Sequence, residues 1–377
     1  MRLFRARPRV VAPLVGVVVP AYDVAALLPA CLDGVLGQTH RELRVVVVDD
    51  GSPDESGEIA ESYAARDERV SVVHTDNHGL GAARNEGLRR LLGEAEVDYV
   101  AFADSDDVVP PDAYATLVRT LERTGSDLAT GSILRWSASE ADGERLTEPG
   151  WMRRFHDPAR LRTTAAEHPR ILGDVFAWNK LYRRTFWEAA GLSWPEGVRY
   201  EDQPTLTRAY LAAEAFDVLP DIVYHWRVRT DGTSITQQRS SVADLRDRHL
   251  TKRDSLDTVE AYVAAGGSPE VREVFLREVL PGDLHRYFAE IPGCTDEWWA
   301  LLVAMVRDLW AGRSLADTTM TPVQRLTGWL VEHDDRPRAT AVMAWVAEHR
   351  RPLPRTGEYV EVPGVDLADV DPAALRV

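Results

Sequence analysis

The chain has 377 residues and a formal net charge of −16, with 44 basic and 60 acidic side chains. A chain of this length folds as two domains or as one large domain with an extension. The acidic balance argues against a general nucleic-acid binder, because binding driven by counterion release needs a basic surface. Cys31 and Cys294 are the only cysteines. This argues against a disulfide framework or a cysteine zinc site and fits a reducing compartment.

The start of the chain contains an apolar run, residues 10–20, that follows several arginines. Such a run can imitate a signal peptide. Its β-branched composition and the proline at its end favour a buried strand instead. The sequence contains no apolar run of about 18 residues, so it predicts no transmembrane helix.

The first half of the chain alternates short apolar runs with amphipathic segments, which predicts βαβ units around a parallel sheet. Several of the expected strands end in acidic residues. Because ligands of open α/β sheets bind at the carboxyl ends of the strands, we expect Asp23, Asp49 and Asp104 along one edge. The expected strands are 16–19 (broken by Pro20), 44–48, 70–74, a run ending at Asp104, and 128–132, and the expected helices are 25–36, 54–66, 82–92 and 112–123.

The second half of the chain is less regular. Residues 136–178 predict loops with short helices, a helix is expected from Tyr200 to about residue 213, and 218–224 is a further strand candidate. After residue 240 the N-cap and proline signals predict helices. The segment 351–377 is broken by prolines and mostly polar, and we expect an extended tail.

The acidic cluster Asp104, Asp106 and Asp107 follows the apolar run 100–103 directly. If the backbone is extended here, Asp104 and Asp106 share a face because a serine separates them. Two hard carboxylates on one face suit Mg²⁺ or Mn²⁺ and leave coordination positions open for phosphate oxygens. The alternative is a solvated acidic turn that caps the helix beginning near Pro111.

Four motifs in a fixed order resemble those of family 2 glycosyltransferases, which are inverting, nucleotide-sugar-dependent enzymes of the GT-A fold. They are residues 17–23 (VVVPAYD), 46–52 (VVVDDGS), 77–85 (NHGLGAARN) and 102–107 (FADSDD), followed by 201–203 (EDQ). The resemblance covers residues 14–235. It implies a GT-A-type, mostly parallel nucleotide-binding α/β sheet flanked by helices in a catalytic domain 1–240. From the helix signals and composition described above, we expect a mainly helical region 241–350 and the tail 351–377 to follow.

The resemblance implies a donor site for a UDP-sugar. Asp49 is expected to accept a hydrogen bond from the uracil imide N–H, since a carboxylate is only an acceptor. Tyr22 is expected to stack on the base, with Pro20 holding the turn and Asp23 near the nucleoside. Arg84 fits a contact with nucleotide or phosphate at the start of a helix; the alternative is an exposed helix arginine.

The resemblance also implies a divalent metal, Mn²⁺ or Mg²⁺, that assists departure of the nucleoside diphosphate. Asp104 is expected to contact the ribose of the nucleotide-sugar or the metal, Ser105 to contact the nucleotide-sugar, and Asp106 to bind the metal. His225 is a further candidate metal ligand, although a histidine at a strand end is equally common without function. Asp107 fits a ligand, a supporting residue or a structural one.

Asp202 is the candidate general base. Inversion by single displacement needs a carboxylate within hydrogen-bond reach of the acceptor hydroxyl. In the family this group belongs to a Glu-Asp pair at the start of a helix, as Glu201 and Asp202 do here. The alternative is an acidic residue that only interacts with the helix dipole.

Further residues are candidates for contacts with the diphosphate or the acceptor. Arg227, Arg229 and Ser234 belong to a basic, glycine-containing loop, and arginines there can hold phosphate bidentately. Glu201 precedes the candidate base, and Asn179 and Lys180 are expected near the acceptor by resemblance alone.

The leading interpretation is therefore a metal-dependent inverting transferase, hexosyl or N-acetylhexosaminyl, that moves a sugar from a UDP-sugar to a hydroxyl. The motifs look most like those of enzymes that decorate wall teichoic acid or build capsular polysaccharide, so the expected acceptor is a glycan or a polyol phosphate. We expect the protein in the cytoplasm or peripherally at the inner face of the cell membrane. The oligomeric state is not predicted.

Three other functions compete with this interpretation. A non-catalytic glycan- or teichoic-acid-binding module would share the fold, but the acidic set is intact here. A nucleotidylyltransferase would need a glycine- and arginine-rich loop where residues 20–23 stand. A polyprenyl-phosphate sugar transferase would be expected to carry membrane spans or a basic amphipathic helix.

Overall fold

The structure, a computed structural model, describes all residues except 1–11, 140–142 and 229–239. The chain divides into two compact units, each considered by itself. The first comprises the described residues of Met1–Arg162, Ala177–Ser193 and Ala213–Val228, and the second those of Thr163–Phe176, Trp194–Ala212 and Arg229–Val377. The described residues confirm the α/β class, with a central sheet flanked by helices and a helical region toward the carboxyl end.

Within the described residues, the sheet has nine strands in the order β3-β2-β1-β4-β8-β5-β9-β7, with β6 paired to β5. Neighbours among β1 to β4 are parallel, as predicted, and β5 is parallel to β9. Strand β8 is antiparallel to both β4 and β5. The strands are β1 (Val15–Ala21), β2 (Leu43–Asp49), β3 (Val70–His74), β4 (Tyr99–Phe102), β5 (Leu128–Ser139), β6 (Gly143–Thr147), β7 (Arg160–Thr163), β8 (Lys180–Arg183) and β9 (Phe216–Arg227).

Strands β1, β2 and β4 are nearly continuous runs of buried apolar residues because helices cover the sheet. Helix α3 approaches β1 and β2 closely at Gly87, where a Cβ atom would lie 2.4 Å from a methyl group of Val18 and 2.9 Å from one of Val48. The helices of the first unit are α1 (Leu28–Leu36), α2 (Ser56–Ala64), α3 (Leu80–Glu94), α4 (Ala113–Thr124), α5 (Gly150–His156) and α6 (Arg184–Ala189).

The prediction that Pro20 breaks the first strand is wrong, because β1 continues to Ala21. Pairing of β1 with β4 ends at Val18, so at Pro20 the strand pairs only with β2. Proline is tolerated at a position where one side of the strand needs no ladder hydrogen bond. The extra residues carry β1 to the register of Asp49 in β2.

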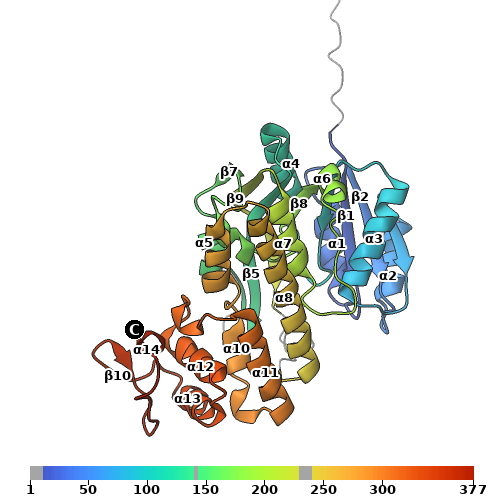
Figure 1. The fold of residues 1–377 in the computed structure, drawn as a ribbon. Helices are drawn as coiled ribbons and strands as arrows, with labels where there is room; N and C mark the ends of the chain where they lie inside the picture. Colours follow the sequence, from blue (N-terminus) through green and yellow to red (C-terminus); the bar gives the residue numbers. More distant parts are fainter. Residues whose placement is uncertain (1–11, 140–142, 229–239) are drawn as a thin grey trace, which may run out of the picture. The chain divides into compact units, whose positions relative to one another are not determined.

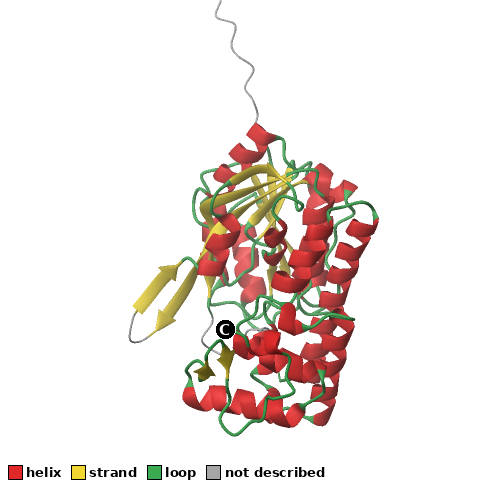
Figure 2. Cartoon of the chain, turned by 60° about the vertical axis from the view of Figure 1, so that its left-hand side comes forward, coloured by secondary structure: helices red, strands yellow, loops and turns green. Residues whose placement is uncertain are grey.

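The segment 136–178 contains more strand than predicted. Strand β5 runs on to Ser139 and forms a hairpin with β6, which projects from the sheet in Figure 2. Every residue of β6 is exposed, so the sequence lacks the apolar alternation that would reveal a strand. The predicted short helices are present as α5 and the 3₁₀ turn η1 (Pro169–Gly173).

The second unit is mainly helical, as predicted for the region after residue 240. Helix α8 packs on α7 and on α11. Its helices and turns are η1, α7 (Asp202–Ala212), α8 (Val242–Ala264), α9 (Pro269–Val274), the π turn η3 (Phe275–Val279), α10 (Leu284–Phe288), η4 (Ile291–Gly293), α11 (Asp296–Leu309), η5 (Leu315–Asp317), α12 (Pro322–Glu332), α13 (Arg336–His349) and α14 (Pro372–Leu375).

The segment after residue 351 is not an extended tail. It forms the two-stranded ribbon β10 (Arg355–Thr356) and β11 (Tyr359–Val360) and ends in α14, which contacts α12. Val360, Val362 and Ala374 are buried, so apolar side chains fix this segment despite its prolines. The predicted domain boundary at residue 240 stays a prediction.

No helix among the described residues is long and apolar enough to cross a membrane.

Candidate active site

The carboxyl ends of neighbouring parallel strands meet at one edge of the sheet. Ala21 of β1 is in register with Asp49 of β2, and Val18 of β1 with Phe102 of β4. The residues that follow these strands therefore lie at a shared edge, as the sequence predicted. This edge carries Tyr22, Asp49 and Asp104.

The loop after β1 presents Tyr22, whose side chain is 47% exposed. The next residues are tied to the start of α2, because the Val24 N–H donates to Ser56 Oγ (3.0 Å) and the Ala25 N–H donates to Asp54 Oδ2 (2.8 Å). Asp23 has a φ of 52°, a left-handed conformation that short polar residues adopt most readily. An exposed, anchored aromatic ring of this kind can stack on a planar base.

Asp49 lies at the end of β2 with little exposure. Its Oδ1 accepts a hydrogen bond from the Ser52 N–H (3.0 Å), and its Oδ2 accepts one from His74 Nδ1 (2.8 Å). Burial would raise the pKa of Asp49, but these hydrogen bonds outweigh it and hold the pKa below its usual value. Asp49 is therefore an ionised acceptor.

Asp50, which the sequence analysis placed in a motif without a role, fixes the loop before α3. Its carboxylate accepts hydrogen bonds from Thr75 Oγ1 (3.1 Å) and from the N–H groups of His78 (3.0 Å) and Gly79 (2.8 Å). This arrangement anchors the amino end of α3, the helix that carries Arg84.

Arg84 is not an exposed helix arginine, since it is 2% exposed and its Nη2 lies 2.6 Å from Asp104 Oδ1. Asp104 in turn donates its backbone N–H to the hydroxyl oxygen of Tyr224 in β9 (3.0 Å). A buried arginine that pairs with a carboxylate holds that carboxylate in one orientation. Arg84 therefore forms an ion pair with Asp104, the first carboxylate of the acidic cluster.

Replacing Arg84 with Met is expected to lower the free energy of unfolding by about 2–3 kcal/mol, because Asp104 then keeps a poorly compensated charge. Urea denaturation measures the effect. The matched control is Arg89→Met on the same helix, whose 71% exposed side chain pairs with Glu86 and should change stability by less than about 1 kcal/mol. Equal losses in the two variants would show that Asp104 needs no buried partner.

The acidic cluster forms a turn and not an extended strand end. The Asp107 N–H donates to the Asp104 carbonyl oxygen (3.1 Å), so the expectation of a shared extended face for Asp104 and Asp106 is wrong. Ser105 is buried within the turn, whereas Asp104 and Asp106 are partly exposed.

Asp107 is a buried structural member of this turn. Its Oδ1 accepts a hydrogen bond from the Arg227 N–H (2.6 Å). Burial, followed by the charges of Asp106 and Asp104, raises the pKa of Asp107 well above its usual value. The carboxylates of the turn therefore lie close enough to repel one another.

The end of β9 docks onto the same turn. The His225 N–H donates to the Val108 carbonyl oxygen (2.9 Å), and the Val108 N–H donates to that of His225 (3.2 Å). Burial lowers the pKa of His225, which favours the neutral imidazole that binds metals. The guanidinium carbon of Arg227 lies 4.3 Å from the ring centre of Trp136, so as placed this side chain stacks on an aromatic ring.

Two carboxylates of the turn are candidates for holding a metal ion. Within the described residues, no group of three or more histidine, cysteine, aspartate or glutamate side chains is arranged to hold a metal ion. Asp104 and Asp106 nonetheless fit Mg²⁺ or Mn²⁺, since such ions bind through one or two carboxylates and complete their shell with water and phosphate oxygens. A bound cation would also offset the repulsion between the carboxylates of the turn.

Asn179 and Lys180 are buried where β8 pairs with β5. Asn179 Nδ2 donates to the Gly131 carbonyl oxygen (2.9 Å), and Lys180 Nζ donates to Asn179 Oδ1 (2.7 Å). Both side chains are 0% exposed. As placed they support the sheet, and their contact with an acceptor stays a prediction.

The candidate base opens helix α7 in the second unit. Asp202 is partly exposed, and its Oδ1 accepts a hydrogen bond from the Gln203 N–H (2.8 Å), whereas Glu201 is buried.

The residue before this pair, Tyr200, has a φ of 63°, which is uncommon for a bulky side chain. Its hydroxyl donates to Asp244 Oδ1 (2.9 Å), and the Tyr287 hydroxyl donates to Asp244 Oδ2 (3.0 Å). Arg248 lies over the Tyr200 ring at 4.5 Å. Buried contacts from α8 and α10 thus fix the backbone that leads into α7.

Two candidate residues, Arg229 and Ser234, lie outside the described residues.

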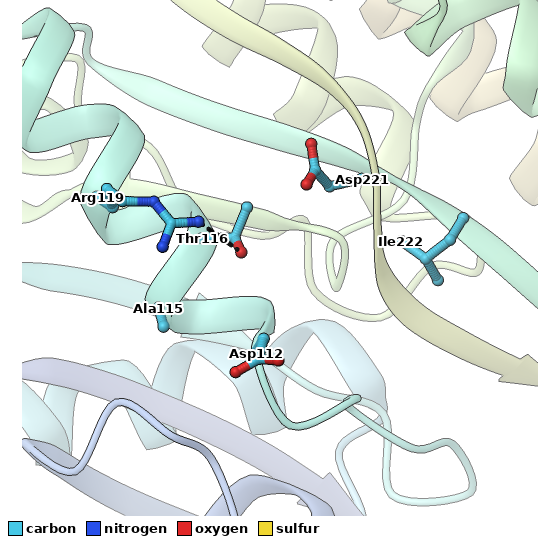
Figure 3. Close-up of a pocket in the computed structure, with 6 residues that line it drawn as sticks. All are labelled: Asp112, Ala115, Thr116, Arg119, Asp221 and Ile222. Carbon is cyan, nitrogen blue, oxygen red and sulfur yellow. Dashed lines mark hydrogen bonds between the residues drawn. The ribbon is translucent and has the colours of Figure 1, made fainter.

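A cavity of about 420 Å³ lies between the start of α4 and β9 (Figure 3). Arg119 donates to Thr116 Oγ1 (3.3 Å) there, and Asp112, Ala115, Asp221 and Ile222 also line it. None of the predicted site residues lines this cavity.

Sequence reasoning missed His74 and Tyr224, which contact Asp49 and the Asp104 backbone. His74 is the last residue of a predicted strand, and this position could have identified it as a candidate site residue. Tyr224 lies at the end of a strand candidate, but its partner Asp104 is 120 residues away, and no local pattern indicates that pairing.

The fold is that of an open α/β protein whose parallel strands carry an exposed tyrosine, an acceptor carboxylate and an acidic turn at one edge, the place where ligands of such sheets bind. Known proteins assign its class more closely. The family described as glycosyl transferase family 2 matches residues 16–188. The uncharacterized glycosyltransferase EpsJ of Bacillus subtilis is 30% identical over 281 residues, which cover 71% of this chain and 76% of EpsJ. The chain therefore belongs to glycosyltransferase family 2 and is a glycosyltransferase.

Two further comparisons show lower sequence identity. The poly(ribitol-phosphate) beta-glucosyltransferase of Bacillus spizizenii is 24% identical over 279 residues, which cover 73% of this chain and 40% of that enzyme. Crystal structures of S. aureus TarS 1–349 superpose with a TM-score of 0.68 in complex with UDP and 0.63 in complex with UDP-GlcNAc. The UDP complex is 20% identical and covers 93% of this chain and 97% of that chain. This likeness shows a shared fold.

Proposed function

We propose that this glycosyltransferase moves a hexosyl or N-acetylhexosaminyl group from a UDP-sugar to a hydroxyl of a cell-surface polymer, with inversion at the anomeric carbon. The observation that carries the proposal is the edge of the sheet where exposed Tyr22, ionised Asp49 and the Asp104 turn come together. The fold likeness to a protein crystallised with UDP and with UDP-GlcNAc supports the choice of donor.

The first unit binds the donor in this proposal. Tyr22 stacks on the uracil ring, and Asp49 accepts a hydrogen bond from the imide N–H. Asp104, held by Arg84, contacts the ribose or a divalent cation, and Asp23 and Ser105 complete the nucleotide-sugar contacts. Neither the stacking nor the hydrogen bond requires these side chains to change protonation.

Asp104 and Asp106 would hold Mg²⁺ or Mn²⁺, with His225 as a further candidate ligand. Such an ion, when bound, neutralises charge on the departing nucleoside diphosphate. Arg227 is proposed to approach the diphosphate only if it leaves its stacking position on Trp136.

Asp202 is proposed as the general base. It accepts the proton of the acceptor hydroxyl while the hydroxyl oxygen forms a bond to the anomeric carbon. The bond from that carbon to the diphosphate oxygen breaks at the same time, and the electron pair leaves with UDP. The assignment rests on the Glu201–Asp202 pair at the start of α7.

The proposed acceptor is a teichoic acid or another glycan or polyol phosphate. The support is the match to an enzyme named for poly(ribitol-phosphate). The proposed place of action is the cytoplasm or the inner face of the cell membrane. Cys31 and Cys294 are free thiols, which fits a reducing compartment.

A nucleotide panel tests the donor. We expect UDP at saturating concentration with Mn²⁺ or Mg²⁺ to raise the melting temperature by several degrees, since a ligand of the native state stabilises it by mass action. GDP, CDP and dTDP should have smaller effects, and EDTA should weaken that of UDP. Differential scanning fluorimetry measures the shifts, and a UDP-sugar hydrolysis screen then identifies the sugar.

The panel also separates the proposal from its competitors. A larger shift with another nucleotide would replace UDP as the donor. The absence of a shift with any nucleotide and any metal would contradict the donor site and favour a glycan-binding role for a degenerate fold.

A further inference from the structure

His74 bridges two carboxylates at the edge of the proposed donor site. Its Nδ1 lies 2.8 Å from Asp49 Oδ2, and its Nε2 lies 2.9 Å from Glu61 Oε1. Asp49 ends β2, His74 ends β3 in register with it, and Glu61 lies on α2. A carboxylate can only accept hydrogen bonds, so both ring nitrogens must donate, which is the state of an imidazolium.

The absence of a side chain at residue 57 leaves space for this bridge. A Cβ atom at Gly57 of α2 would lie 2.6 Å from Asp49 Oδ2 and 3.3 Å from His74 Cε1. Any larger residue at this position would displace the carboxylate or the ring. Strand β2, strand β3 and helix α2 therefore converge on one carboxylate oxygen.

We propose that His74 is a positioning residue for nucleobase recognition, which fixes the Asp49 carboxylate as an ionised acceptor that selects uracil over cytosine. This inference rests on the proposed function of Asp49. Uracil presents an N–H donor at the ring position where cytosine presents a bare nitrogen acceptor. A carboxylate held ionised attracts the first and repels the second.

The geometry leaves Asp49 able to accept from a base. The Ser52 N–H uses one acceptor position of Oδ1 and His74 uses one of Oδ2. A carboxylate offers about four such positions, so acceptor capacity remains after both bonds are made. The two donors fix the plane of the carboxylate, and the remaining capacity then has a fixed direction.

The charges around His74 agree with this protonation state. Hydrogen bonds from the ring to Glu61 first, and then to Asp49, raise the pKa of His74 above its usual value and outweigh the opposite effect of desolvation on this half-exposed side chain. Strand β3 packs against β2 and α2, and the charged groups that face His74 from these elements are Asp49 and Glu61. Both are acids, so both favour the imidazolium.

The sign of the pH dependence follows. The bridge is complete below about pH 6.5, the ordinary pKa of histidine, and is lost as the pH rises through the raised pKa of His74 in the folded protein. A neutral ring can donate from only one nitrogen, so one carboxylate then loses its hydrogen bond. UDP affinity should fall over that interval.

The test is titration calorimetry of the full chain with UDP and with CDP between pH 6 and pH 9. His74→Asn leaves a neutral donor near Asp49 that cannot reach Glu61. It should weaken UDP binding about tenfold at the low end of this range, narrow the preference for UDP over CDP, and remove the protein's part of the pH dependence. The pH dependence of UDP binding that remains in this variant is assigned to titration of the ligand. It can be subtracted from the pH dependence of the wild type.

Glu61→Gln is the second variant, and a purely structural role of His74 would not produce its effect. It keeps the bond from His74 to Asp49 but removes the larger cause of the raised pKa, so the fall in UDP affinity should move to lower pH. The matched control is Glu58→Gln, the same change at an exposed position of α2, which should bind as the wild type does. Circular dichroism melts confirm that each variant is folded.

The outcomes distinguish failure of the proposed donor site from failure of the role proposed for His74. If the wild type does not bind UDP at any pH, the proposed donor site fails and this inference fails with it. If the wild type binds UDP but His74→Asn and Glu61→Gln keep its affinity, its pH profile and its preference over CDP, the role of His74 alone is overturned.

Discussion

Asp202→Asn is expected to lower kcat by about 100-fold to 10,000-fold, the usual contribution of a general base. The amide has the size of the carboxylate but cannot take the proton of the acceptor hydroxyl. Its oxygen can still accept the hydrogen bond that Asp202 Oδ1 now receives from the Gln203 N–H at 2.8 Å. Helix α7 should therefore form normally, and the loss should appear in the chemical step.

The measurement is the rate of UDP release from the UDP-sugar identified by the hydrolysis screen, with acceptor present. UDP affinity is measured in parallel and should be unchanged, because Asp202 makes no proposed contact with the nucleotide. The matched control is Glu270→Gln, an exposed acid in the first turn of α9, for which we expect wild-type kcat. Full activity in Asp202→Asn would refute the assignment of the base.

Replacing Asp106 with Asn is expected to lower kcat/KM by about 100-fold or more, since the divalent cation contributes several kcal/mol to stabilising the leaving group. An amide oxygen is a weaker ligand than a carboxylate for Mg²⁺ and Mn²⁺. Asp106 lies in a turn that already holds Asp104 and Asp107, and burial, followed by the charges of Asp106 and Asp104, raises the pKa of Asp107. A cation is the natural compensation for that charge.

Calorimetry with Mn²⁺ in the presence of UDP provides a readout apart from turnover. The wild type should bind the metal, and Asp106→Asn should bind it at least about tenfold more weakly. Asp76→Asn, an exposed aspartate at the same edge without a proposed role, is the matched control. Equal metal affinity in the wild type and in Asp106→Asn would move the metal ligand elsewhere or remove the metal from the reaction.

The part of the fold that could be predicted has local signals. Buried parallel strands such as β2 are uninterrupted apolar runs, and the helices between them have amphipathic spacing. The helices after residue 240 carry N-cap residues and prolines, as Thr321 does with its capping box. Because strands alternate with helices, the strands run parallel, and Asp49 and Asp104 at their carboxyl ends lie at the same edge of the sheet.

The part that could not be predicted depends on partners that are distant in sequence. Strand β8 enters the sheet between β4 and β5 although it follows both in the chain, and its length of 4 residues gives little pattern. In the sequence, Pro20 indicates a strand end. The structure shows that β4 pairs with β1 only as far as Val18, so no hydrogen bond to β4 is lost at Pro20. Asn179 and Lys180 carry no local signal of burial, yet both are buried in the sheet and hydrogen-bonded there.

The sequence by itself determined the family and the acidic residues at the strand ends, because each motif is a short local run whose order along the chain is visible. Only the tertiary structure decided the state of those residues. It surrounds Asp49 with Ser52 and His74, pairs Asp104 with Arg84, and buries Asp107 against β9. The ionisation and orientation of a carboxylate depend on desolvation and on nearby donors and charges. Folding brings these groups together from separate strands and helices, and no local pattern in the sequence records them.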